Sequence, residues 1–151
     1  MSRIDAQFAG LRRENKKALI AYVTAGFPRV SILTDLVKAM EQVPVDVLEL
    51  GVPFSDPLAD GPTIQAASSR ALENGITPRL VFRMVENLRR NRLIVPVALL
   101  TYANPVLRYG IKKFCRHALL SGADGFVVPD LPTEEAQELI EESRPLGLNT
   151  I

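Results

Sequence analysis

Short apolar runs alternate with longer stretches of helical periodicity along this chain, and no other feature of the sequence constrains its fold as strongly. Nearly continuous apolar runs are typical of parallel strands that are buried on both faces. The runs lie at residues 18–26, 45–54, 95–105 and 125–132, and a fifth begins with the letters LNTI at 148–151. Helical patterns occupy residues 30–42, 62–75, 77–91, 110–121 and 133–145. Strands and helices in alternation predict right-handed βαβ units and therefore an α/β fold.

Residue types mark some of the helix boundaries. Pro62 and Gly75 stand where the helix over 62–75 is expected to begin and end. Thr133 precedes two glutamates and predicts the start of the last helix. A short helix is also predicted at the N-terminus, where three apolar residues share one face: Ile4, Phe8 and Leu11.

Two architectures fit this order of elements. A doubly wound sheet of five strands, as in flavodoxins, would fill 151 residues almost completely. A (β/α)8 barrel, or TIM barrel, needs about 250 residues, so this chain would supply its first half, with strands 1 to 4 and the start of strand 5. The short length favours the doubly wound sheet, whereas the apolar run that has barely begun at Ile151 favours the barrel. The pattern by itself leaves the two architectures equally open.

Composition limits the classes of function. The formal net charge of +1 favours neither nucleic acid nor a membrane surface as a partner. No apolar run reaches the roughly 18 residues of a membrane span, and the N-terminus lacks the apolar core of a secretory signal. Cys115, the only cysteine, cannot form an internal disulfide, which suits a cytoplasmic protein. One cysteine and one histidine supply neither a zinc-binding set nor a Cys–His catalytic pair.

Glu49 interrupts the apolar run at 45–54, and its position suggests chemistry. Side chains alternate along a strand, so Glu49 lies on the face opposite to Leu48 and Leu50. If the leucines face the covering helices, Glu49 points inward near the carboxyl end of the strand, where active sites lie in both architectures. Partial burial would raise its pKa from about 4.3 toward neutrality, so that the carboxyl group could donate and accept a proton. The alternative is a structural glutamate paired with a basic side chain or with backbone amides.

The loop after the same run carries a second acid, Asp60, between prolines at 53, 57 and 62. Prolines restrict the backbone, so the loop could hold a carboxylate in a defined place. The plainer interpretation is that Asp60, Gly61 and Pro62 form a turn that starts the next helix. Residue types alone do not decide between the two.

Weaker candidates follow the later strands. Tyr102 and Asn104 could line the same pocket, although Asn104, which precedes a proline, also fits a turn. Asp130 has a plain explanation in a turn toward Pro132. His117 lies in the middle of a predicted helix and is expected at the surface.

Four stretches of the chain are distinctive in sequence, order and spacing: YVTAGFP at 22–28, LELGVPFSDPLADGPTIQ at 48–65, TYANPVLRYG at 101–110 and VVPDLP at 127–132. Together they resemble the α subunit family of tryptophan synthase, and the resemblance covers essentially the whole chain. It implies a (β/α)8 barrel and a lyase of tryptophan biosynthesis. The implied reaction is the retro-aldol cleavage of indole-3-glycerol phosphate to indole and glyceraldehyde 3-phosphate.

The same resemblance implies roles for individual residues. Two acids carry the chemistry in that family, and they match Glu49 and Asp60. Glu49 would be the general acid and base that protonates the indole ring carbon, and Asp60 would accept a hydrogen bond from the indole N–H. The residues that would line the indole pocket are Tyr22, Leu100, Tyr102 and Val127.

A partner is implied as well, because the family assembles with a β subunit in an α2β2 heterotetramer. The residues that would meet the β subunit are Pro53, Asp56, Pro57, Asn104 and Pro132. Pyridoxal phosphate would belong to the β subunit, so neither a cofactor nor a metal is expected in this chain.

Length is the point at which the chain departs from the family, whose members continue through strands five to eight. We therefore expect residues 1–151 to form a single domain that is the N-terminal part of a TIM barrel, cut short of those strands. Barrels of this kind commonly build their phosphate site after strands seven and eight. The chain alone would lack that site and is expected to be inactive by itself. The alternative function is a non-catalytic half-barrel that docks on the β subunit.

Overall fold

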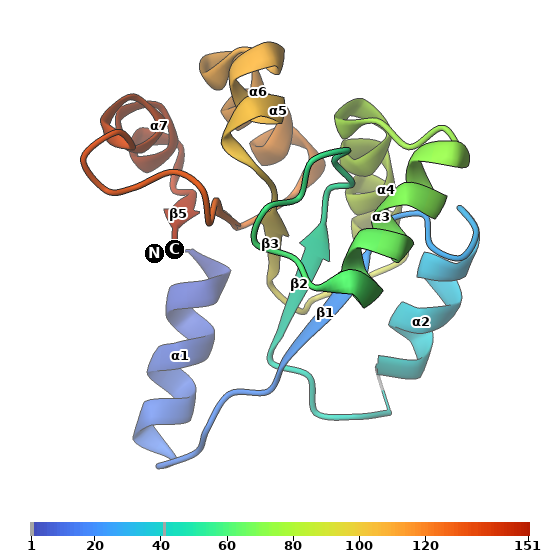
Figure 1. The fold of residues 1–151 in the computed structure, drawn as a ribbon. Helices are drawn as coiled ribbons and strands as arrows, with labels where there is room; N and C mark the ends of the chain where they lie inside the picture. The colour runs from blue at the N-terminus through green and yellow to red at the C-terminus, as the bar shows by residue number, and fades with distance from the viewer. Residues whose placement is uncertain (1, 41) are drawn as a thin grey trace.

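Five parallel strands form one sheet in the part of the chain that the computed structural model describes, residues 2–40 and 42–151. They are β1 (Ile20–Thr24), β2 (Val47–Gly51), β3 (Val97–Leu100), β4 (Gly125–Val127) and β5 (Asn149–Thr150). Their order in the sheet is the order of the sequence, β1-β2-β3-β4-β5 (Figure 1). A flavodoxin-type doubly wound sheet would instead have the order 2-1-3-4-5, with a switch point. The consecutive order is that of a barrel, and the doubly wound alternative is wrong.

Seven α-helices and one short 3-10 helix accompany the strands within the same described residues. They are α1 (Arg3–Arg13), α2 (Ile32–Met40), α3 (Pro62–Glu73), α4 (Pro78–Arg90), α5 (Ala103–Tyr109), α6 (Ile111–Ser121), α7 (Gln137–Ser143) and η1 (Arg144–Leu146). The helices predicted at the N-terminus and over 30–42, 62–75, 77–91 and 110–121 are confirmed. None of the described helices is long and apolar enough to cross a membrane.

Two boundaries differ from the sequence-based expectation. The third apolar run is a strand only to Leu100, and α5 begins at Ala103, so Asn104 lies inside a helix and not in a turn. The following proline is tolerated there because amide groups in the first helical turn have no intrahelical partner. The start predicted at Thr133 is also wrong, because a hydrogen-bonded turn over 132–136 precedes α7, which begins at Gln137.

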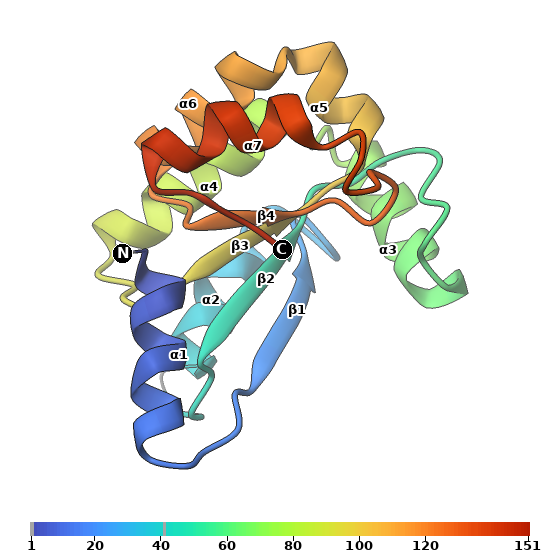
Figure 2. The ribbon, with the colours of Figure 1, turned by 90° about the vertical axis from the view of Figure 1, so that its left-hand side faces the viewer.

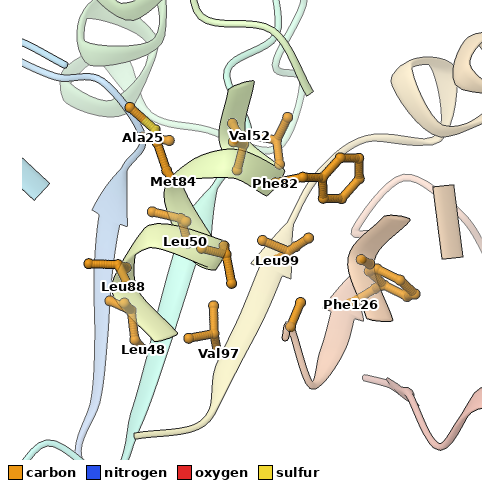
Figure 3. Close-up of a cluster of buried hydrophobic side chains, with 14 of the residues drawn as sticks. Ala25, Leu48, Leu50, Val52, Phe82, Met84, Leu88, Val97, Leu99 and Phe126 are labelled. Atoms are coloured by element: carbon orange, nitrogen blue, oxygen red, sulfur yellow. The ribbon is translucent and has the colours of Figure 1, made fainter. Parts of the chain in front are cut away.

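The main core lies between the sheet and four helices, α2, α4, α6 and α7. We call the face of the sheet that these helices cover its outer face. Leu48 and Leu50 of β2 and Leu99 of β3 are at most 1% exposed. Figure 3 shows them against α4, whose Met84 and Leu88 point toward the strands. The condition for the predicted inward direction of Glu49, that the β2 leucines face the covering helices, is therefore met.

The inner face of the sheet holds the side chains that alternate with those leucines. Val47 and Ala98 pack there with Ile4 of α1 in a small cluster of their own. Figure 2 shows α1 on one side of the strands and α6 and α7 on the other. Because Glu49 is two residues from Val47 in the same strand, its side chain points to the inner face, as predicted.

A buried ion-pair network lies at the amino ends of β3 and β4. Asp124 is 4% exposed and accepts hydrogen bonds from Arg3 Nη1 and Arg89 Nη2, both at 2.7 Å. It also accepts one from the Val97 amide at 2.8 Å. Arg89, 14% exposed, donates further hydrogen bonds to the carbonyl oxygens of Gly122, Leu93 and Val95. This end of a barrel serves stability rather than catalysis.

An aromatic cluster joins α4, α5 and α6. The Tyr109 hydroxyl and His117 Nδ1 are hydrogen-bonded at 2.5 Å, and both rings lie edge-on to Phe82. His117 is thus half-buried, so its expected surface position is corrected. On the same helix Cys115 is fully buried, and burial raises the pKa of its thiol to about 11.

The turn after β1 is held by the end of α3. Asn74 follows the helix, and its side-chain amide donates to the carbonyl oxygens of Gly26 and Pro28, each at 3.0 Å. Gly26 has a φ of +84°, a conformation that favours glycine. One side chain therefore fixes the segment that leaves the first strand.

Candidate active site

The predicted site residues of the first four strands meet on the inner face. Tyr22 of β1 is in register with Glu49 of β2, and one step further along the sheet Leu100 of β3 is in register with Val127 of β4. In a parallel sheet, side chains in register lie on the same face. Gly51 relates the two pairs of residues, because it is in register with Leu100 and lies two residues after Glu49 on the same face of β2. All four predicted residues are partly exposed on that face.

Glu49 occupies the third of the five positions of β2, so it lies within the strand and not at its end. The side chain is partly buried, and burial raises the pKa of its carboxyl group above the ordinary value. Within residues 2–40 and 42–151 no hydrogen bond or ion pair engages this carboxylate. The alternative of a structural glutamate needs such a partner, so the geometry favours a carboxyl group that is free to exchange a proton.

Tyr22 is within electrostatic reach of both acids. Its hydroxyl is 3.2 Å from Thr24 Oγ1. Burial and then the negative charges of Asp60 and Glu49 raise the pKa of the phenol, while the hydrogen bond to Thr24 lowers it. Both carboxylates therefore lie near the same hydroxyl group, although eleven residues of sequence separate them.

Gly51 makes room for that phenol. A Cβ atom at this position would lie 2.8 Å from Cζ of Tyr22 and closer still to the hydroxyl oxygen. The sequence motifs did not identify Gly51 as a site residue. A signal was present, because glycine in a strand interior often marks a close approach.

The loop from β2 to α3 presents Asp60 through two local turns. The Leu58 amide donates to the Asp56 carbonyl and the Asp60 amide to the Pro57 carbonyl, both at 3.0 Å. Gln65 of α3 donates to the Asp60 carbonyl at 2.9 Å. Gly61, and not Asp60, is the N-cap of α3, and no side chain caps that helix. The turn interpretation accounts for the backbone at Asp60 and not for its carboxylate, which lies beside the Tyr102 hydroxyl.

Tyr102 behaves differently from the other predicted pocket residues. It is 2% exposed, and its hydroxyl accepts a hydrogen bond from the Ala59 amide at 3.2 Å. Its ring lies against Phe54 with centroids 5.6 Å apart. The contacts of Tyr102 are thus made to the loop that carries Asp60, and a contact with substrate stays a prediction.

Asp130 has a role that its sequence context did not indicate. Its Oδ1 accepts a hydrogen bond from the Ala103 amide at 2.8 Å, so it holds the first residue of α5. The expected explanation, a turn toward Pro132, is incomplete for that reason. The carboxylate joins the end of β4 to the segment that follows β3.

The residues predicted to meet a partner lie around the same end of the sheet. A cavity of about 400 Å³ opens between segment 53–55, segment 76–78 and α5, and both Pro53 and Asn104 line it. Asp56 is exposed and accepts a hydrogen bond from Ser55 at 2.5 Å. Two other predicted residues, Pro57 and Pro132, do not line the cavity.

Among residues 2–40 and 42–151, no group of three or more His, Cys, Asp or Glu side chains is arranged to hold a metal ion. The described side chains at this end of the sheet include two carboxylates, Glu49 and Asp60, and the phenol groups of Tyr22 and Tyr102. The charge of Asp60 acts on both phenols, and that of Glu49 acts on Tyr22.

Comparison with known proteins places this geometry in a family. The sequence profile described as "Tryptophan synthase alpha chain" matches residues 8–151. The tryptophan synthase alpha chain of Thermoanaerobacter pseudethanolicus is 45% identical over 151 residues, which are 100% of this chain and 57% of that protein. This chain thus spans a little over half the length of the curated relatives that it matches.

Solved structures agree with the sequence comparison. Tryptophan synthase subunit alpha from Legionella pneumophila superposes with a TM-score of 0.95 at 41% identity, over 99% of this chain and 57% of that one. A tryptophan synthase complex from Pyrococcus furiosus contains a chain that matches with a TM-score of 0.82 at 42% identity, over 88% of this chain and 55% of that one. The consecutive parallel sheet corresponds to the first strands of these TIM barrels. The chain belongs to the tryptophan synthase alpha chain family.

Proposed function

We propose that this chain carries the two catalytic acids of a tryptophan synthase alpha-type lyase, which acts on indole-3-glycerol phosphate in tryptophan biosynthesis. The activity is that of the whole protein, since this chain matches 57% of its relative's length. The bond that breaks joins the indole ring to the glycerol phosphate side chain. The products are indole and glyceraldehyde 3-phosphate.

In this proposal Glu49 moves the protons. Its carboxyl group gives a proton to the ring carbon that bears the side chain, and positive charge then develops at the ring nitrogen. The resulting carboxylate takes the proton of the adjacent glycerol hydroxyl, and the carbon–carbon bond breaks as the aldehyde forms. The bonding electrons return to the ring, which leaves as indole, and Glu49 is again protonated. A carboxyl group can act in both directions when its pKa is raised toward neutrality.

Asp60 is the proposed charge partner of the ring nitrogen. It would accept a hydrogen bond from the indole N–H and stabilise the positive charge that the protonation creates. Its support is electrostatic, because its charge acts on the phenols of both Tyr22 and Tyr102. Tyr22, Leu100 and Val127 would contact the apolar ring from the inner face of the sheet.

One observation supports the proposal most directly. Glu49 is partly buried, has no hydrogen-bond or ion-pair partner in the described chain, and has a raised carboxyl pKa. The test is Glu49→Gln in the protein that carries this chain, with indole release as the assay. General acid–base catalysis is worth roughly 100- to 10,000-fold, so kcat should fall by that factor. The matched control is Glu138→Gln, an exposed position on α7. If the Glu49 variant kept the wild-type rate, Glu49 would not be the proton carrier.

We also propose that the β subunit docks over the cavity between segment 53–55 and α5. Leu107 of α5 is 60% exposed and Leu58 of the preceding loop is 86% exposed, so apolar side chains face solvent on either side. Asp56 and Pro132 would lie at the edge of that interface. Pyridoxal phosphate would be bound by the β subunit and not by this chain.

A charge placed on α5 tests the docking surface. Leu107→Glu should abolish association with the β subunit in sedimentation velocity, because a charge would be buried at the interface. Leu120→Glu, at a 69% exposed position on α6, serves as the control and should assemble normally. Normal assembly of the Leu107 variant would exclude this face.

A further inference from the structure

The Tyr102 hydroxyl lies at the contact between two strand ends. Tyr102 is the N-cap residue of α5, two residues beyond the end of β3. Its hydroxyl accepts the hydrogen bond of the Ala59 amide at 3.2 Å, and Ala59 directly precedes Asp60. A group that follows β3 therefore holds the backbone beside an acid that follows β2.

Tyr102 is itself fixed from the next strand. The amide of Thr101 donates to the Val127 carbonyl at 2.9 Å, and the amide of Ala103 donates to Asp130 Oδ1 at 2.8 Å. The residues on both sides of Tyr102 are thus bonded to β4 and to the segment after it. Two hydrogen bonds, one at Ala59 and one at Ala103, connect the segments that follow β2, β3 and β4.

The loop has few other attachments. Leu58 at its tip is 86% exposed. The remaining hydrogen bonds of segment 53–60 are made within the loop or to Gln65 of the adjoining α3. In the described part of the chain, the bond to Tyr102 is the one that ties segment 53–60 to another strand end.

We propose that Tyr102 is a positioning residue, whose hydroxyl places Asp60 by holding the Ala59 amide. The inference rests on the proposed function, because a defined place for Asp60 matters only if its carboxylate meets the indole N–H. It assigns the phenol a role distinct from lining the pocket. The ring packs against Phe54, and the hydroxyl orders the loop.

The substitution Tyr102→Phe separates these two roles. It keeps the ring and its contact with Phe54 but removes the acceptor of the Ala59 amide. A residue that serves packing alone would tolerate the change without effect on the loop. A positioning residue would release the loop and displace Asp60 from the substrate.

Amide hydrogen exchange in the protein that carries this chain is the first measurement. Loss of one hydrogen bond should speed exchange at Ala59 roughly three- to tenfold. Tyr109→Phe, which removes the hydroxyl bonded to His117, is the matched control and should leave exchange in segment 53–60 at the wild-type rate. Unchanged exchange at Ala59 in the Tyr102 variant would overturn the proposal.

Steady-state cleavage of indole-3-glycerol phosphate is the second measurement. The Tyr102 variant should lower kcat by roughly three- to tenfold with little change in KM, since Asp60 acts on the charge that develops during the reaction. Faster exchange with an unchanged kcat would overturn the positioning role. A wild-type protein that cleaves no substrate would refute the proposed function instead, so the two failures are distinguishable.

Discussion

Arg89 and Arg3 bind the same carboxylate from environments of opposite exposure, so their removal should have very different costs. Arg89 is 14% exposed and Arg3 is 52% exposed, and each donates to Asp124 at 2.7 Å. Breaking a buried ion pair from one side typically costs about 3–5 kcal/mol, whereas an exposed pair contributes about 0–1 kcal/mol. Arg89→Met also removes the side-chain donor of the Leu93 and Val95 carbonyl oxygens, whereas the Gly122 carbonyl keeps its hydrogen bond from Arg3 at 3.3 Å. Methionine keeps the apolar stem of the side chain.

Urea unfolding measures the difference. With an m-value of about 2 kcal/mol/M, the midpoint should fall by about 1.5–2.5 M for Arg89→Met and by at most about 0.5 M for Arg3→Met. Burial lowers the pKa of the Arg89 guanidinium, and the charge of Asp124 opposes that shift. Equal midpoints for the two variants would refute the reasoning, because they would show that burial does not decide the strength of these pairs.

Three further predictions concern the site and its supports. Glu49→Gln should raise the urea midpoint at pH 7, because burial raises the pKa of this carboxyl group and disfavours its charged form. The gain in stability should vanish below about pH 4, where the carboxyl group is protonated in the unfolded protein as well. A lower midpoint at pH 7 would indicate a favourable partner for the charge. Gly51→Ala should lower the free energy of unfolding by about 1–3 kcal/mol, because the added methyl group forces Tyr22 to move. The same unfolding assay measures this loss, and indole release should fall as well. Wild-type values in both assays would contradict the close approach of Tyr22 to Gly51. Asn74→Ala should lower the free energy of unfolding by about 1–3 kcal/mol and make the turn at 26–28 accessible to proteases. An unchanged pattern of proteolytic cleavage would contradict this prediction.

Hydrophobic periodicity correctly predicted the N-terminal helix and the helices over 30–42, 62–75, 77–91 and 110–121, because each has a regular apolar face. The alternation around Glu49 correctly predicted that Glu49 and the two leucines of β2 lie on opposite faces, because successive side chains of a strand alternate; the packing against α4 then identifies the leucine face as the covered one. The sheet order could not be predicted from the pattern, since both architectures use the same sequence of elements. It required the register of the strands, which the structure supplies.

Other features depend on contacts that local sequence does not contain. The sequence analysis did not predict α5, because Asn104 and the proline after it fit a turn. The first amide of this helix, that of Ala103, donates to Asp130, which lies 27 residues further along the chain at another strand end. The pair of Arg89 and Asp124 spans 35 residues, and neither residue is unusual in its own segment. The hydroxyl contact of Tyr102 is likewise a product of the fold.

The burial of Cys115 gives the protein an intrinsic reporter of its own fluctuations. Thiols react as thiolates, so a fully buried group with a pKa of about 11 should resist alkylating reagents in the native state. It is the only cysteine of residues 1–151, so modification of Cys115 itself marks an opening of α6. The ratio of its reaction rate to that of an unfolded thiol gives the population of the open form. Peptide mapping of the alkylated Cys115 would then follow the opening of this helix without an introduced label or substitution.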